Sequence, residues 1–202
     1  MELDPTTTAV LAIHCQGDVI SAEGAFAPFF FDEVWRRKVV QKVGDLLDAA
    51  RAAGSTIVYT RVAFRPDYTD LVPNSPLLQG VVQGGSLKEG SPLAEIVEPL
   101  TPHPDDAVVT HQSVGGMTPE LEALLAGRGI KTVLVAGVAT NVSVESTARA
   151  AVDRGYQVFI VEDACSAATA AVHEAAVESM GLLAPSVQVA DVARAFAPAH
   201  SA

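Results

Sequence analysis

The feature that most constrains this chain is a regular alternation between short apolar segments and segments with the 3.6-residue period of helices. The apolar segments are hydrophobic at mostly consecutive positions, which is typical of strands covered on both faces. Strands and helices in strict alternation predict an α/β domain with a parallel sheet. The expected strands are 9–13, 56–60, 107–110, 132–136, 157–161 and 187–189, and the expected helices are 33–53, 119–128, 141–154, 170–183 and 191–197.

Two connections between these elements are unusually long. Residues 63–106 hold seven prolines and four glycines, so we expect a loop-rich segment, with a small helix at most, that covers the site or contacts a partner subunit. Residues 21–32 contain four phenylalanines, which indicate a pocket wall or an oligomer contact. Ordinary packing beneath a loop explains these phenylalanines equally well.

The composition limits the class of protein and of partner. With 202 residues, 49% of them hydrophobic, we expect one domain over residues 1–202 with a large core. The net charge of −11 argues against nucleic acid and membranes as partners and leaves a small-molecule substrate. No apolar segment is long enough for a membrane helix, no signal peptide is recognisable, and two cysteines are too few for a disulfide framework. We therefore expect a cytoplasmic protein.

The segment Gly-Val-Ala-Thr-Asn-Val-Ser at 137–143 lies between an expected strand and an expected helix. A strand that turns sharply into a helix presents free backbone N–H groups at the start of that helix. A nucleophile placed there has an oxyanion site built from the same backbone. Ser143 is therefore the candidate nucleophile, and the N–H groups of Ala139, Thr140 and Ser143 are the candidate oxyanion donors.

Polar residues at the ends of the strands are candidates for the same site. In open α/β sheets, ligands bind beyond the carboxyl ends of the strands. His14 and His111 follow two of the expected strands, so two of the five histidines lie at the edge that carries Ser143. Neighbouring side chains of a strand point to opposite faces, which argues against Cys15, beside His14, as a nucleophile.

These residues resemble a known family. The segments 137–143, 145–149 and 161–165, together with His14-Cys15-Gln16-Gly17-Asp18 after the first strand, are similar to motifs of the isochorismatase-like cysteine hydrolase superfamily. That superfamily includes nicotinamidases and N-carbamoylsarcosine amidases. The resemblance implies a Rossmann-like three-layer α/β/α domain with a six-stranded parallel sheet, in a homo-oligomer such as a dimer or tetramer. It also implies a cis peptide bond between Val138 and Ala139.

The resemblance does not extend to the catalytic triad. The superfamily uses an aspartate, a lysine and a cysteine, and the matching positions here are His14, His111 and Ser143. Because all three identities differ, the thiolate mechanism of the family does not carry over. The family's metal motif, an aspartate and two histidines, has no match in the segment 61–67, and we expect no metal and no other cofactor.

The three replacements are mutually compatible. A serine hydroxyl needs an adjacent general base, and a neutral histidine supplies one. We therefore predict a hydrolase of small amides, carbamates or esters in which Ser143 attacks and His14 takes its proton, while His111 orients the base or polarises the carbonyl. The assignment of the base to His14 rather than His111 stays open. A histidine base predicts a rate that rises through roughly pH 6–7.

Three alternatives also stay open. Loss of all three triad residues fits a protein that binds a small ligand without catalysis. A protonated His14 can donate a proton to a vinyl ether, which would resemble the isochorismate-cleaving relatives. His14, His111 and Asp18 can also supply metal ligands.

Four further residues are candidates for contact with the substrate: Gln16, Asp18, Arg61 and Phe26. Gln16 and Asp18 follow the first strand and alternatively shape its turn. Arg61 lies past the second strand and can bind an anionic or carbonyl group, or make a surface contact. Phe26 belongs to the aromatic connection.

Overall fold

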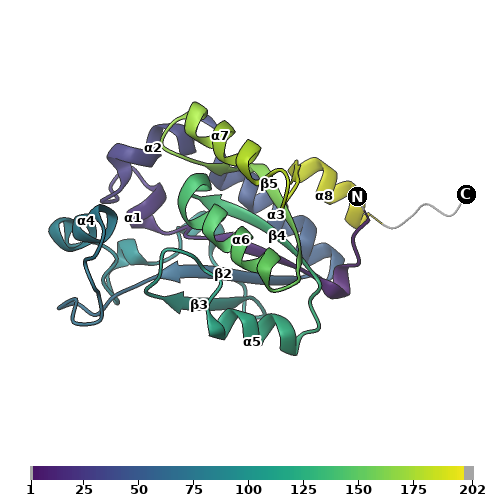
Figure 1. Cartoon of the computed structure of the whole chain (residues 1–202), viewed down its shortest axis with the longest axis horizontal. Coiled ribbons are helices and arrows are strands. Elements are labelled where there is room, and N and C mark those ends of the chain that lie inside the picture. Colours follow the sequence, from purple (N-terminus) through teal and green to yellow (C-terminus); the bar gives the residue numbers. More distant parts are fainter. Residues whose placement is uncertain (1, 198–202) are drawn as a thin grey trace, which may run out of the picture.

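A computed structural model describes residues 2–197 of the chain, and its centre is one six-stranded sheet (Figure 1). All neighbouring strands are parallel, in the order β3-β2-β1-β4-β5-β6. The α/β class and the six-stranded parallel sheet expected from the sequence are confirmed. The strands are β1 (Thr8–Ile13), β2 (Thr56–Val62), β3 (Ala107–His111), β4 (Thr132–Val138), β5 (Gln157–Ser166) and β6 (Ser186–Val187).

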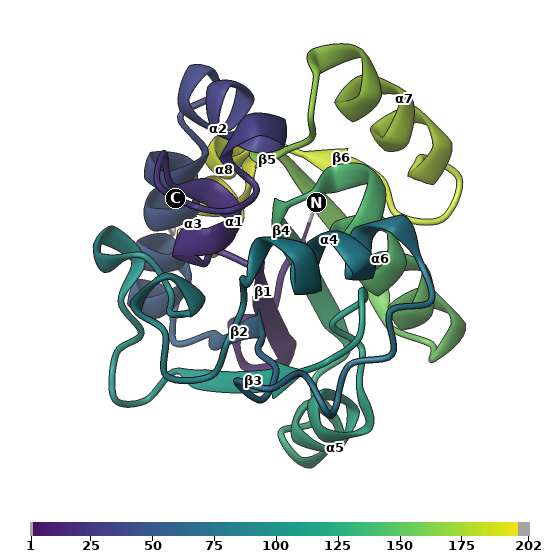
Figure 2. The ribbon, with the colours of Figure 1, turned by 90° about the vertical axis from the view of Figure 1, so that its left-hand side faces the viewer.

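Helices cover both faces of the sheet and complete three layers (Figure 2). On one side, α3 packs against β1, β2, β4 and β5 and also contacts α8, while α6 and α7 lie on the other side. The α-helices are α1 (Gly17–Ile20), α2 (Ala27–Arg36), α3 (Val39–Ala53), α4 (Pro76–Gly84), α5 (Pro119–Gly127), α6 (Glu145–Asp153), α7 (Ala170–Met180) and α8 (Val189–Phe196). Short 3₁₀ helices are Pro5–Thr7, Pro92–Ala94 and Glu98–Leu100, and Thr140–Val144 form a π-helical turn.

The core lies on both faces of β1 and β4, the two central strands. Every residue of these two strands is buried, which explains why their sequences are apolar without alternation. The chain runs from β1 outward to β2 and β3, and then returns to place β4 on the other side of β1. The point between β1 and β4 is therefore the place where the strand order reverses, and ligands of such sheets bind beyond the strand ends at this point.

The longest of the expected helices is divided in the structure. The helix expected over 33–53 is two helices, because the chain breaks at Arg37 and Lys38, where Lys38 adopts a left-handed backbone with φ of 55°. The first of them, α2, begins at Ala27, so most of the phenylalanines of the connection 21–32 are helical. The helical period continues across the break, which is why the sequence pattern does not show it.

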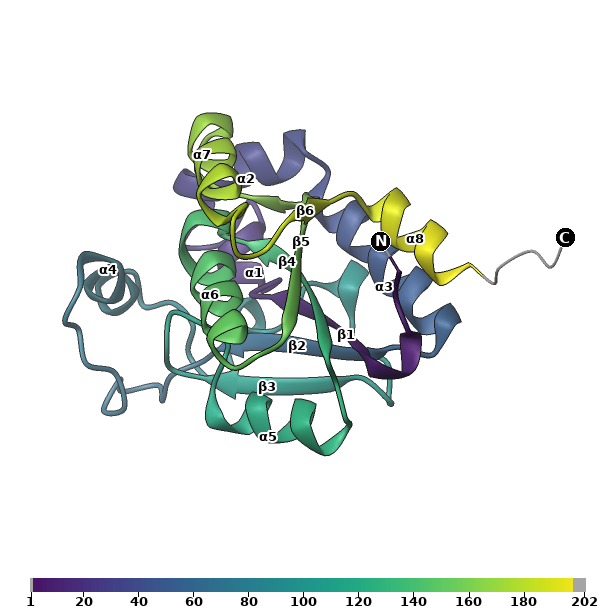
Figure 3. The same cartoon turned by 45° about the vertical axis from the view of Figure 1, so that its right-hand side comes forward.

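The connection from 63 to 106 contains the small helix α4 and two 3₁₀ turns, as its prolines and glycines allow. Pro76 occupies the first turn of α4, and the Ser75 hydroxyl accepts a hydrogen bond from the N–H of Leu78 at its start. This helix lies beyond the carboxyl ends of the strands (Figures 1 and 3). Among residues 2–197, the structure contains no helix with the length and apolarity to cross a membrane.

Candidate active site

The ends of β1, β3 and β4 bring the three predicted catalytic residues to one edge of the sheet. His14 follows β1, His111 is the last residue of β3, and Ser143 lies in the π-helical turn that follows β4. All three side chains are buried, with 4 to 6% of each residue exposed. His14 and Ser143 line the same cavity. The sequence predicted that His14 and His111 lie near each other from their places at the strand ends and from their match to the family's triad positions.

The two histidine rings are in direct contact. Nε2 of His14 lies 3.3 Å from Nε2 of His111. On its other side, Nδ1 of His111 lies 3.2 Å from Oγ of Ser113, whose hydroxyl donates to the carbonyl of Gly115 at 2.8 Å. Because the Ser113 proton is used in this way, its oxygen accepts from Nδ1–H of His111. The neutral His111 ring then accepts at Nε2 from Nε2–H of His14, which leaves Nδ1 of His14 unprotonated.

Burial keeps both imidazoles neutral. Burial, together with a smaller contribution from the neighbouring His111, lowers the pKa of His14 from its ordinary value of 6.5 to about 3. Burial also lowers the pKa of His111 to about 4. The pair therefore supplies an unprotonated nitrogen at neutral pH, and it carries no positive charge there.

The turn that carries Ser143 is wider than the α-helix expected from the sequence. The carbonyl of Ala139 accepts from the N–H of Val144, five residues later, which is the hydrogen bond of a π-helix. Such single turns are frequent at functional sites. The Val138–Ala139 peptide bond is cis, as the family resemblance implied. The Thr147 hydroxyl donates to the carbonyl of Ser143 at 2.6 Å and so holds this turn onto α6.

Gly137 is required by the close approach of β4 to β1. It has a φ of 121°, and a Cβ atom built on it would lie 2.1 Å from the carbonyl oxygen of Ile13. A side chain at this position would push β4 away from β1. The absence of a side chain at Gly137 therefore allows the turn that carries Ser143 to lie close to the end of β1, next to His14.

A third buried histidine, which the sequence prediction missed, contacts this turn. The Arg37 guanidinium donates to Nε2 of His173 at 2.8 Å, so the His173 ring carries its proton on Nδ1. Nδ1 lies 2.8 Å from the hydroxyl of Thr140, the first residue of the π-helical turn. Burial and the Arg37 charge lower the pKa of His173 to about 4. No local sequence signal marks this contact, because Arg37 and His173 are 136 residues apart.

The cavity beside Ser143 measures about 70 Å³, and helices α1, α2 and α4 supply part of its lining. The phenylalanines predicted as a pocket wall contribute Phe26 and Phe30, whereas Phe29 is 62% exposed. Leu77, Leu78 and Val81 of α4 close the cavity from above the strand ends. The connection 63–106 therefore forms part of the wall of the cavity beside Ser143.

Gln16 and Asp18, two of the predicted substrate contacts, bind the protein's own backbone instead. The Gln16 amide accepts from the N–H of Val62 and donates to the carbonyls of Val62 and Ala94, with all three distances between 2.6 and 2.8 Å. The Asp18 carboxylate accepts from the N–H of Leu87 at 2.7 Å. Both residues are buried outside the cavity lining, and they fasten the covering segment to the sheet.

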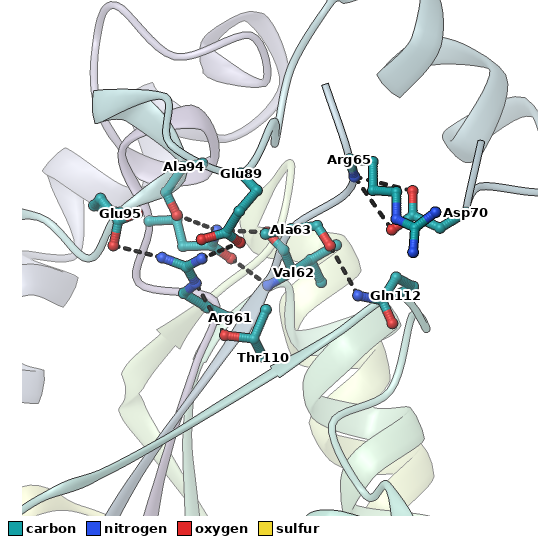
Figure 4. A network of polar contacts seen from close by, with 11 residues as sticks. Arg61, Val62, Ala63, Arg65, Asp70, Glu89, Ala94, Glu95, Thr110 and Gln112 are labelled. Carbon is teal, nitrogen blue, oxygen red and sulfur yellow. Dashed lines mark hydrogen bonds and ion pairs between the residues drawn. The ribbon is translucent and has the colours of Figure 1, made fainter. Parts of the chain in front are cut away.

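Arg61 also lies outside the cavity lining and is neutralised by two carboxylates (Figure 4). Its guanidinium forms ion pairs with Glu89 and Glu95, and its Nε donates to the hydroxyl of Thr110 at 3.1 Å. These contacts hold two points of the connection 63–106 against β2 and β3. The structure therefore assigns Arg61 the same fastening role as Gln16 and Asp18.

The chemistry of the other possible nucleophiles and ligands is limited. Cys15 and Cys165 are fully buried outside the cavity lining, and burial raises the pKa of each thiol to about 12. A protonated, inaccessible thiol is a poor nucleophile. Within residues 2–197, no three histidine, cysteine or acidic side chains gather as metal ligands, and Asp18 in particular does not join His14 and His111. The metal alternative therefore lacks its third ligand.

Comparisons with known proteins agree with this architecture. The chain is 32% identical over 181 residues to an uncharacterised isochorismatase family protein, YecD, of Escherichia coli O157:H7, covering 86% of this chain and 87% of that protein. It is also 32% identical over 177 residues to the ureidoacrylate amidohydrolase RutB of Caulobacter vibrioides, covering 81% of this chain and 79% of RutB.

A solved structure supports the same conclusion. The crystal structure of a cysteine hydrolase from Pseudomonas syringae pv. phaseolicola 1448A superposes with a TM-score of 0.87 at 28% identity, over 97% of this chain and 95% of that one. The sequence model of the isochorismatase domain matches residues 8–193, which include His14, His111 and Ser143. This chain therefore belongs to the isochorismatase family of hydrolases.

Proposed function

We propose that this protein hydrolyses small amides, carbamates or esters with Ser143 as the nucleophile and His14 as its general base. One observation carries the proposal. Among the hydrogen bonds of residues 2–197, Oγ of Ser143 and Nδ1 of His14 have no partner, and both residues line one cavity at the reversal of strand order. The relative RutB, named as an amidohydrolase, supports the carbonyl chemistry.

The proton path follows from the tautomers. As Oγ of Ser143 attacks the carbonyl, its proton passes to Nδ1 of His14, directly or through one water. His14 is then an imidazolium, and its Nε2–H bond to His111 strengthens because a charged donor forms a stronger hydrogen bond. Ser113 keeps His111 in the accepting tautomer. His111 therefore orients and stabilises the base, in the place that a carboxylate takes in other serine hydrolases.

The remaining steps use the same groups. The N–H groups of Ala139, Thr140 and Ser143 are proposed to bind the oxyanion, since the first turn of a helix leaves such donors free. His14 then gives its proton to the leaving nitrogen or oxygen as the bond to the carbonyl carbon breaks. Water, deprotonated by the same nitrogen, hydrolyses the acyl-Ser143 ester and restores the free enzyme.

The low pKa of His14 argues against one alternative and changes one expectation. Cleavage of a vinyl ether needs a protonated His14, but burial lowers the pKa of this ring to about 3 and keeps it neutral at neutral pH. For the same reason, we now expect the rate to rise with pH near the lowered pKa of His14, and not at pH 6–7 as for an ordinary histidine. A ligand-binding protein without catalysis is the alternative that the experiment below addresses.

Hydrolysis of a panel of amides, carbamates and esters by three variants tests the proposal. Ser143→Ala and His14→Asn are expected to lose about a hundredfold or more in kcat. Asparagine tolerates the left-handed backbone at position 14, where φ is 48°. Ser146→Ala, an exposed serine three residues after Ser143, is the matched control and should retain wild-type activity. Turnover that survives in Ser143→Ala would refute the serine mechanism.

The assembly and location expected from the sequence stay proposals. We propose a homo-oligomer in the cytoplasm that acts on a small molecule and binds neither nucleic acid nor membrane. Light scattering coupled to size exclusion gives the molar mass in solution, and a mass equal to one 21.0 kDa chain would refute the oligomer.

A further inference from the structure

The wall of the cavity that faces Ser143 is almost entirely apolar. Val19, Phe26 and Phe30 come from α1, α2 and the segment between them, and Leu77, Leu78 and Val81 come from α4. The remaining wall consists of further apolar side chains and of Ser113 beside the histidine pair. The polar side chains of the lining thus lie on the side where the proposed chemistry takes place.

The cavity also lacks a charged group. None of the sixteen residues that line it is a lysine, an arginine, an aspartate or a glutamate. The guanidinium of Arg61, which the sequence offered as a partner for an anion, is held by Glu89 and Glu95 outside the lining. His14, which lines the cavity, and His111, which contacts it, are both neutral at neutral pH.

A carboxylate that entered this cavity would lose its hydration without gaining a cation in return. Burial of an unpaired charge is among the most unfavourable steps in protein chemistry, whereas an apolar group of the substrate gains from leaving water. The volume of about 70 Å³ is roughly half that of a cavity of 150 Å³ that holds benzene, which limits the apolar group to a few carbon atoms.

We propose that the substrate of this site is an uncharged amide or ester whose acyl group is small and apolar, and that carboxylate-bearing substrates are rejected. This inference rests on the proposed function for the position of the scissile carbonyl at Ser143. It separates this chain from its relative RutB, which is named for its action on ureidoacrylate, a carboxylate.

Binding to the Ser143→Ala variant tests the inference without requiring catalysis. The probes are butyramide and succinamate, which differ by a terminal methyl group against a carboxylate. Ligand-observed NMR at pH 7.5 is expected to show butyramide binding at least tenfold more tightly than succinamate. Equal binding, or tighter binding of succinamate, would overturn the inference.

Variants that add a cation to the wall provide the reciprocal test. Leu78→Lys is expected to shift the ratio of the two binding constants at least tenfold towards succinamate. Leu77→Lys tests a second position at the rim of the cavity, where Leu77 is 37% exposed. Leu77→Gln is the matched polar control, and it should not favour the carboxylate. If neither lysine variant, confirmed as folded, changes the preference, the two amides do not bind in this cavity and the inference fails.

The outcomes separate this inference from the proposed function. If Ser143 is not the nucleophile, release of ammonia from butyramide is either absent in the wild type or survives in Ser143→Ala, while the Ser143→Ala variant still prefers butyramide in the binding assay. If the substrate class is wrong, Ser143 remains essential for turnover while the preference for the uncharged amide disappears.

Discussion

Replacement of His14 by asparagine is expected to make the fold less sensitive to acid. In the folded protein, burial lowers the pKa of this ring from 6.5 to about 3. In the unfolded chain the ring is hydrated and takes up a proton as the pH falls below about 6.5. The unfolded state therefore binds more protons between pH 6.5 and 3, so His14 lowers the stability of the folded state progressively as the pH falls through this window.

The magnitude follows from the two pKa values. At pH 4.5 the pH is two units below the pKa of His14 in the unfolded chain, while the folded ring is still neutral, which lowers the stability of the folded state by about 3 kcal/mol. At pH 7.5 the same contribution is close to zero. His14→Asn removes the titrating group and keeps the left-handed backbone. Between pH 7.5 and 4.5, the free energy of unfolding of the variant is therefore expected to fall by about 3 kcal/mol less than that of the wild type.

Urea unfolding at pH 7.5 and 4.5 measures this difference directly. The test compares the change in unfolding free energy between the two pH values in the variant with the same change in the wild type. Contributions from groups that titrate alike in both proteins cancel, and so does a loss of packing that is the same at both pH values. His103→Asn, at an exposed position before β3, is the matched control and should show the wild-type change. If His14→Asn loses as much stability as the wild type between the two pH values, the burial argument for His14 is refuted.

Three further predictions concern the base, the close approach of β4 to β1 and the support of the turn. With the pKa of His14 near 3, kcat/KM should be independent of pH from 8 to 5, and an inflection near pH 6.5 in a steady-state profile would contradict this assignment. Gly137→Ala should lower the free energy of unfolding, measured with denaturant, by at least about 3 kcal/mol, because its Cβ would clash with the carbonyl of Ile13. A smaller loss would show that β4 can shift. His173→Leu should lower kcat about tenfold with little change in KM, because the Thr140 hydroxyl loses its hydrogen-bond partner. His173→Asn supplies an amide N–H in place of Nδ1–H and should restore most of the kcat. Equal kcat values in the two variants would argue against a positioning role for His173.

The strands and the edge that carries the site were predictable from the sequence because each depends on local patterns. Continuous apolar runs identify strands covered on both faces. His14 directly follows one such run, and the turn that carries Ser143 follows another. The break between α2 and α3 was not predictable, because the apolar period passes through Lys38 without interruption. The π-helical turn likewise replaces α-helix without a change in residue type.

The roles of individual polar residues were harder to predict because they depend on partners far away in the chain. Gln16 and Arg61 lie near strand ends, as ligand-binding residues do. Some of their partners, Ala94, Glu89 and Glu95, belong to the connection 63–106, whose course no periodicity predicts. His173 contacts Thr140 across 33 residues and Arg37 across 136. Only the tertiary fold shows which polar atoms remain free for a substrate.

The most direct test of the account is the identity of the atom that carries the acyl group during turnover. The protein is mixed with 4-nitrophenyl butyrate, quenched with acid within the first turnover, and digested for peptide mass spectrometry. The account predicts a butyryl group on Ser143 in the wild type and none in Ser143→Ala. A butyryl group on His14 or Cys15 during productive turnover, or hydrolysis with no acyl-protein at any time point, would contradict it.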